Sequence, residues 1–275
     1  YMKNKFQVIV IHLLVFLFLE NVVAAQPRAT DEEMLFIEIP TVITAAKKEQ
    51  EINKAPATVR VITAEEIRER GYLSIQEAVS DLPGIQFRDI LGFNSYIFMR
   101  GATSQNNLFI MLIDGVRHNE INSGGAYGGN QYNLSNIERI EVLYGPTSAL
   151  YGTNAISGII NIITKKPDNN SSYVSGMVGN FNTRSADFNY NNYNEQKELG
   201  FSIGGMLNGT EKADLRGSKG DNNWTDDMEN FENDMELNGK FTWRKFNASI
   251  LLQDKKASRT TNFKTVDGSY LDKDT

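Results

Sequence analysis

The stretch from Ile137 to Lys166 constrains the fold most, because strand and turn signals follow one another closely in it. Charged and apolar residues alternate over 139–144, which predicts a strand with one buried face. The glycine-proline pair at 145–146 ends that strand, and residues 147–152 can form a single capped helical turn. The apolar run 159–163 predicts a strand that is buried on both faces. The stretch therefore predicts a compact αβ element with closely packed backbone segments.

Two upstream motifs extend this stretch into a resemblance to a known family. They are Met99-Arg100-Gly101 and Leu112-Ile113-Asp114-Gly115-Val116, and they occur in the expected order before Ile137. Together the three segments resemble the plug domain of TonB-dependent outer-membrane receptors, which are energy-coupled importers of ferric siderophores, cobalamin, haem and some sugars. The resemblance covers roughly residues 37 to 166. It implies an α+β plug domain, which we place at residues 50–167.

Capping signals predict two short helices near the start of this plug. Thr63 with Glu66 has the capping-box spacing, and Ser74 with Glu77 repeats it for a helix over residues 75–82. Further plug strands are predicted at residues 58–63, 95–101 and 108–113.

The first 25 residues have the pattern of a cleaved secretory signal peptide. Lys3 and Lys5 provide the positive flank, Phe6–Leu19 provides the apolar run, and Val23-Ala24-Ala25 provides a small-residue cleavage site. The apolar run is shorter than the ~20 residues that a membrane-spanning helix needs. We therefore expect export and cleavage after Ala25.

Residues 26–49 predict a periplasmic extension that contains a β-prone run without an evident partner in the core. Pro40 excludes a central position in a sheet, so the run suits an edge strand that adds to another protein. By the resemblance this is the TonB box, which pairs with the TonB-type energy-transducing protein; an ordinary linker is the alternative. We name it the coupling segment, and it comprises Ile39, Pro40, Thr41, Val42, Ile43, Thr44 and Ala45.

Arg100 is a candidate contact between the plug and the barrel wall. It ends an apolar strand face, where an unpaired guanidinium would be costly to bury, and the resemblance implies carboxylate partners on the barrel; a solvated strand end is the alternative. The family often has arginine where this chain has Tyr144.

The loops 88–94 and 117–131 are rich in glycine and asparagine. The resemblance implies that they form a ligand-facing apex, with Phe93, Asn94, Tyr127 and Asn130 as candidates, and plain surface loops are the alternative.

Residues 168–275 change to alternating segments that are separated by turns. Leu199, Phe201 and Ile203 face one way while Gly200 and Ser202 face the other, which is typical of a transmembrane β-barrel. A soluble antiparallel sheet is the alternative. The predicted strands are 173–178, 186–193, 199–207, 235–243 and 246–253, with a long extracellular loop over 208–233.

A plugged barrel needs about 22 strands, whereas this region holds about five. The sequence therefore predicts an α+β plug followed by the start of a transmembrane antiparallel β-barrel, in the N-terminal part of a longer protein.

Composition excludes several other classes of function. A net charge of -6 does not fit a nucleic-acid-binding protein, and the absence of cysteine excludes zinc-thiolate sites and cysteine nucleophiles. Outside the signal peptide His118 is the one histidine, and we expect it to be an exposed loop residue. No nucleophile-base pair, metal cluster or phosphate loop is evident, so we expect neither an enzyme nor a cofactor.

The resemblance implies energy-coupled uptake of a scarce ligand, such as a ferric siderophore or cobalamin. The expected location is the outer membrane of a Gram-negative cell, and the expected partners are the energy-transducing protein, the membrane lipid and the ligand. A soluble periplasmic binding or signalling module, built on a plug-like domain, is the alternative.

Overall fold

The computed structural model describes residues 41–55, 57–91, 94–103, 108–120, 124–153, 155–168, 172–211 and 231–257. The chain divides into two units, 1–39 and 40–275, and all described residues lie in the second. The predicted signal peptide, Ile39, Pro40 and Phe93 lie outside the described residues. Within the described ranges no helix is long and apolar enough to cross a bilayer.

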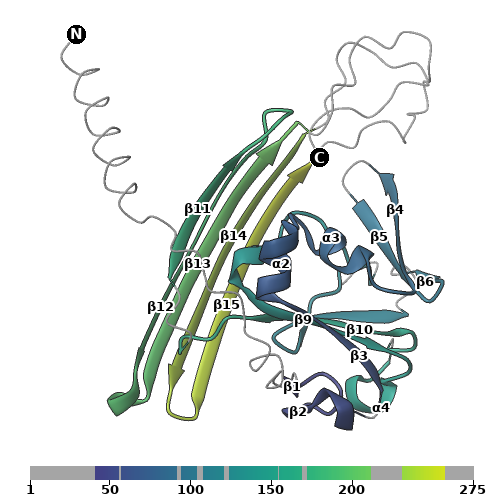
Figure 1. Ribbon diagram of the computed structural model, residues 1–275, viewed down its shortest axis with the longest axis horizontal. Helices are drawn as coiled ribbons and strands as arrows, with labels where there is room; N and C mark the ends of the chain where they lie inside the picture. Colours follow the sequence, from purple (N-terminus) through teal and green to yellow (C-terminus); the bar gives the residue numbers. More distant parts are fainter. Residues whose placement is uncertain are drawn as a thin grey trace, which may run out of the picture. The chain divides into compact units, whose positions relative to one another are not determined.

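A five-stranded sheet, which we call the core sheet, organises the first part of the unit (Figure 1). Its strand order is β3-β9-β10-β7-β8, and β10 pairs in parallel with β7 but antiparallel with β9. The central strand β10 is buried on both faces, as its continuous apolar run predicts. The strands are β3 (Thr58–Thr63), β7 (Phe109–Ile113), β8 (Val116–Arg117), β9 (Ile137–Tyr144) and β10 (Gly158–Thr164).

Two short helices, α2 (Ala64–Arg70) and α3 (Ile75–Ser80), pack on one face of the core sheet. The predicted caps are present, since Thr63 Oγ1 accepts from Glu66 N and Ser74 Oγ accepts from Glu77 N, each at 3.1 Å. Capping satisfies amide groups that a helix leaves free at its first turn. Ile67, Val79 and Ile140 belong to the resulting apolar cluster.

The opposite face of the core sheet is covered by the N-terminal segment. Here β1 (Thr41–Val42) pairs with β2 (Gln50–Glu51), and Val42 and Ala45 pack into a second apolar cluster with Leu143. The prediction that β9 has one buried face is therefore wrong, because Glu141 and Leu143 on its second face are also fully buried. The second cover comes from residues almost a hundred positions away.

Three further strands form a separate small sheet of order β4-β5-β6. They are β4 (Ile85–Leu91), β5 (Asn94–Met99) and β6 (Ala102–Thr103). Part of the predicted loop 88–94 is thus strand. The remaining short elements are α4 (Ser148–Tyr151), η2 (Ile52–Lys54), η4 (Leu134–Asn136) and η5 (Glu195–Lys197).

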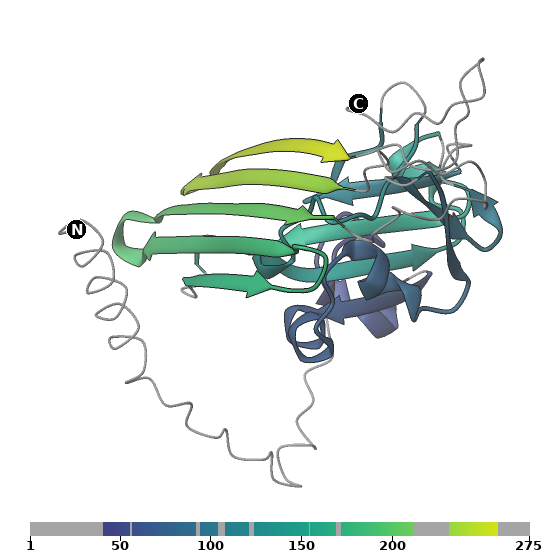
Figure 2. The same cartoon turned by 90° about the horizontal axis from the view of Figure 1, so that it is seen from above.

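The second part of the unit is an antiparallel sheet in sequence order, β11 to β15, which we call the long-strand sheet. Figures 1 and 2 show its strands side by side in a curved layer. Its strands are β11 (Tyr173–Val178), β12 (Arg184–Asn194), β13 (Leu199–Thr210), β14 (Glu232–Trp243) and β15 (Phe246–Ala257). The predicted loop 208–233 is shorter than expected, since both its ends belong to strands.

The two faces of the long-strand sheet differ in chemistry. Along β14 the polar residues Asp234, Glu236 and Asn238 are buried, while Met235 and Leu237 between them are exposed. The predicted alternation in β13 is confirmed, with Phe201 and Ile203 exposed and Ser202 buried. This apolar-out, polar-in pattern matches a barrel that is exposed to lipid outside and filled inside.

Candidate functional site

The coupling segment is docked onto the core sheet through Thr44. Its hydroxyl donates to Glu141 Oε2 at 2.6 Å and accepts from Asn161 Nδ2 at 3.0 Å. Its backbone amide donates to Glu141 Oε2 at 2.8 Å, and its carbonyl accepts from Tyr151 Oη at 2.9 Å. The prediction that this segment has no partner in the core is therefore wrong for the part that the structure describes. Thr44 and its neighbours are held by side chains that lie far away in the sequence.

Glu141 is the centre of this contact. Besides Thr44, the amide of Ile43 donates to its carboxylate at 3.0 Å, and Arg139 Nε donates to it at 2.9 Å. The carboxylate is fully buried, so these donors replace water as its solvation. Burial, together with this nearby charge, raises the pKa of Tyr151.

A second set of polar contacts joins the core sheet's connecting loops to the long-strand sheet, and we call it the seam. Near η4, Ser135 Oγ donates to Asp187 Oδ1 at 2.7 Å, and Asn189 Nδ2 donates to Asn136 Oδ1 at 2.5 Å. Asn133 Nδ2 also donates to a carbonyl of β13 at 3.4 Å. Several side chains on the concave face of the long strands thus bond to the connecting loops of the core sheet.

The seam continues through His118 and Gln253. His118 Nε2 lies 3.0 Å from Gln253 Oε1, and Gln253 Nε2 donates to Glu236 Oε2 at 2.9 Å. The same Glu236 oxygen accepts from the Asn133 amide at 3.2 Å. The prediction of an exposed His118 is wrong, because the ring is half-buried and contacts Tyr132 edge-on. Burial lowers the pKa of His118, although the hydrogen bond with Gln253 opposes this.

An ion pair closes the seam at the β7–β8 turn. Lys240 Nζ lies 2.9 Å from Asp114 Oδ2 and donates to the Thr164 carbonyl at 3.0 Å. Asp114 also accepts from the Thr164 amide and hydroxyl, so the turn, the end of β10 and strand β14 are tied together.

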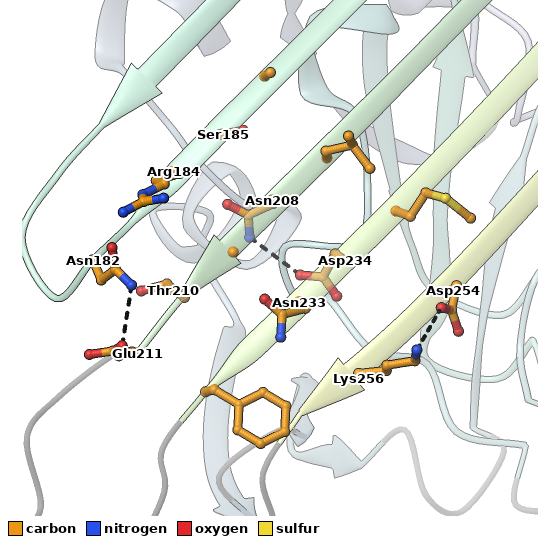
Figure 3. A pocket seen from close by; sticks show the side chains of 15 residues that line it. Asn182, Arg184, Ser185, Asn208, Thr210, Glu211, Asn233, Asp234, Asp254 and Lys256 are labelled. Atoms are coloured by element: carbon orange, nitrogen blue, oxygen red, sulfur yellow. Dashed lines mark hydrogen bonds and ion pairs between the residues drawn. The ribbon is translucent and has the colours of Figure 1, made fainter. Parts of the chain in front are cut away.

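Two of the hollows in the described residues lie along the long-strand sheet. A cavity of about 600 Å³ lies between the seam and β14–β15, with Tyr132, Glu236 and Lys240 in its lining. Another hollow, of about 650 Å³, lies at the ends of strands β12 to β15 (Figure 3). There Asn208 donates to Asp234 at 3.4 Å, as the figure shows. The predicted ligand-facing residues line neither of these two hollows.

The predicted apex residues that the structure describes lie on different segments of the plug. Asn94 begins β5, whereas Tyr127 and Asn130 lie in the loop before η4, where both are half-buried. Tyr127 Oη donates to Glu120 Oε2 at 3.2 Å. Arg100 is exposed, and its guanidinium stacks over Tyr144 at 5.2 Å from the ring centroid. Tyr144 thus supports the guanidinium at the position where the family often has a second arginine.

Sequence reasoning missed Glu141, Asn161 and the asparagines of the seam as functional candidates. Glu141 gave no signal of its own, because it alternates with apolar residues in β9 as a residue on a solvent-exposed strand face would. In the described residues no three His, Asp or Glu side chains gather as a metal site.

Comparison with known proteins gives a family match for the first part of the described fold. Residues 51–159 match the family described as "TonB-dependent Receptor Plug Domain". The chain is 36% identical over 150 residues to "Vitamin B12 transporter BtuB" of Vibrio vulnificus, covering 54% of this chain and 24% of that protein. It is 36% identical over 156 residues to "Iron-regulated outer membrane virulence protein" of Vibrio cholerae, covering 54% and 22%. The chain thus spans about a quarter of the length of these relatives.

Solved structures show the same fold over a larger share of the chain. The pyoverdine outer membrane receptor FpvA of Pseudomonas aeruginosa superposes with a TM-score of 0.63 at 18% identity, over 79% of this chain and 30% of that one. The ferric yersiniabactin uptake receptor FyuA of Yersinia pestis gives 0.57 at 19% identity, over 74% and 32%. Residues 51–159 therefore belong to the TonB-dependent receptor plug family, and the fold as a whole, with its partial, unclosed β-barrel, is that of the TonB-dependent receptors.

Proposed function

We propose that this chain is the N-terminal part of an outer-membrane receptor that imports a scarce small ligand, of the ferric siderophore or cobalamin class. A periplasmic TonB-type protein supplies the energy. The relatives named for vitamin B12 transport and iron regulation support this ligand range. We also propose export by the signal peptide with cleavage after Ala25, a plug over residues 50–167 and barrel strands from residue 168 onward.

One observation carries the proposal: the long-strand sheet is polar where it meets the plug and apolar on its other face. Glu236 and Asp187 bind plug groups on the concave face. Ile203, Leu207 and Leu237 are exposed on the other face. A soluble periplasmic module, the alternative, would leave these side chains in water, and large apolar patches on soluble proteins are uncommon. The arrangement therefore favours a plugged barrel in lipid.

The residue roles follow from this assignment. Phe93, Asn94, Tyr127 and Asn130 are proposed to face the ligand on the outer side, and Arg100 to contact carboxylates of the barrel wall. The coupling segment, Ile39 to Ala45, is proposed to pair with the energy-transducing protein by strand addition. Ligand capture followed by plug rearrangement makes and breaks no covalent bond, so no catalytic residue and no cofactor are involved.

The test is a chimera in which residues 1–167 replace the matching N-terminal region of the cobalamin transporter relative. We expect energy-dependent cobalamin uptake by cells that carry the chimera, and none in cells that lack the TonB-type protein. Equilibrium binding of cobalamin to the same cells is the control, because the relative's barrel supplies most of that site. Normal binding without any energised uptake would contradict the proposed coupling role of the plug.

A further inference from the structure

Thr44 has all its backbone and side-chain polar groups occupied by side chains of the plug. Three of the four donors to the buried Glu141 carboxylate come from the coupling segment: the Ile43 amide, the Thr44 amide and the Thr44 hydroxyl. We propose that Glu141 is a latch that holds the coupling segment closed and so controls when the segment becomes available to a partner. The identity of that partner rests on the proposed function, but the latch itself does not.

The docked segment is unable to add to a partner strand through these groups. Strand addition takes its affinity from main-chain hydrogen bonds along the added strand. In the docked state the amides of Ile43 and Thr44 are bound to Glu141, and the Thr44 carbonyl is bound to Tyr151. These bonds therefore have to break before a partner strand can pair with the segment.

The buried Glu141 carboxylate makes partial detachment of the segment unfavourable. A buried charge is costly unless donors replace its water, and bonds to an ionised acceptor are stronger than those between neutral groups. If the segment leaves, Glu141 keeps only the 2.9 Å bond from Arg139, so water has to reach the fully buried carboxylate. Partial detachment would leave the charge both buried and unsatisfied. The segment is therefore held either fully docked or fully released, with Glu141 hydrated in the released state.

Asn161 connects the latch to the seam. Its Nδ2 donates to the Thr44 hydroxyl, and its Oδ1 accepts from the Gly115 amide at 3.3 Å. Gly115 follows Asp114, which binds Lys240 of the barrel strand β14. Movement of the β7–β8 turn relative to the barrel thus acts on the hydroxyl that Glu141 binds.

The chain contains no cysteine, so a single introduced thiol reports opening at one place. Val42→Cys reports on the segment, and Val79→Cys on α3 reports on the other apolar cluster; both valines are fully buried. Each reporter is combined with Glu141→Gln or with Glu138→Gln. Glu138 is the matched control, because it also binds Arg139 and makes no described contact with the segment. The measurement is the rate of maleimide labelling of the full chain in detergent micelles.

We expect Glu141→Gln to raise labelling at residue 42 by about tenfold or more, which corresponds to the loss of about one charge-assisted hydrogen bond. Labelling at residue 79 stays slow, and Glu138→Gln changes neither rate. An unchanged rate at residue 42 would overturn the proposal. If Glu141→Gln speeds labelling at both residues, the deciding variant is Thr44→Val, because it leaves Glu141 in place. Faster labelling at residue 42 alone, which Thr44→Ser reverses, supports the latch. If Thr44→Val does not give this selective increase, the proposal is overturned. Labelling needs neither ligand nor energy-transducing protein, so its outcome is independent of the uptake test.

Discussion

At the scale of single residues, Gly158 sets the distance between β9 and β10. Its φ is +152°, and a Cβ at this position would lie 2.1 Å from the Leu143 carbonyl oxygen and 2.5 Å from Met99 Sδ. Because the nearest atom belongs to the backbone, relief requires a shift of the strand. No larger residue fits here without moving the core sheet.

We therefore predict that Gly158→Ala lowers the free energy of unfolding by about 1–3 kcal/mol or more, the usual cost of overpacking. Urea denaturation of the full chain measures it. Gly176→Ala is the control, since the nearest atom to its Cβ lies 3.8 Å away. Equal denaturation midpoints for the two variants would contradict the close approach.

His118 is the residue from which a pH dependence is expected. Its pKa is lowered in the folded protein by burial, below the unfolded value of about 6.5. As the pH falls through this window the unfolded chain binds the proton more readily, so the stability that is complete above about pH 6.5 declines.

The prediction is that His118→Gln makes thermal unfolding less sensitive to a change from pH 7.5 to pH 5.5 than it is in the unaltered chain. Glutamine still offers a donor to Gln253, so the variant removes the titration with little change in packing. An identical pH dependence in both proteins would exclude His118 as its source.

At the scale of elements, β1 has an observed packing role beside the coupling role that we propose for it. Val42 belongs to the strand-prone run of the coupling segment, and it also fills the second apolar cluster. A substitution there is therefore expected to change the observed docking as well as the proposed pairing with a partner.

We predict that Val42→Pro abolishes uptake by the chimera, because proline removes a backbone donor and bends the strand. Val42→Ala keeps the backbone pattern that strand addition needs, so it lowers uptake less than Val42→Pro does. Cobalamin binding should survive both changes. Normal uptake by Val42→Pro would place the coupling segment elsewhere in the chain.

At the scale of the whole molecule, the long-strand sheet separates two environments. Several polar groups of its concave face bond to plug groups along the seam, and its other face is apolar. Ile203 lies in the middle of β13 on that apolar face and is 44% exposed. Such a side chain is expected to contact the lipid hydrocarbon.

We predict that Ile203→Arg weakens membrane insertion of the chain by about 2–4 kcal/mol, the cost of a cation near the bilayer midplane on a barrel's lipid face. Retention in lipid vesicles after a urea wash measures it. Asn233→Arg, at the exposed end of β14, should be retained like the unaltered chain. Equal retention of both variants would mean that this face does not meet lipid.

The sequence by itself determined the local elements. The capping pairs Thr63–Glu66 and Ser74–Glu77, the continuous apolar run of β10 and the alternation in β13 appear where predicted. These signals succeed because a cap or a strand face depends on residues a few positions apart. The plug motifs, met in order, also predicted the plug domain that the family match over residues 51–159 supports.

Only the tertiary structure decided what each element is buried against. Thr44 and Glu141 are 97 residues apart, and His118 and Gln253 are 135 apart. Neither pairing has a periodic signal in the sequence, so β9 was expected to have one exposed face and His118 to be exposed. A buried polar group is satisfied by whichever donor the packing brings within about 3 Å, and that partner is fixed by the arrangement of the sheets rather than by local sequence.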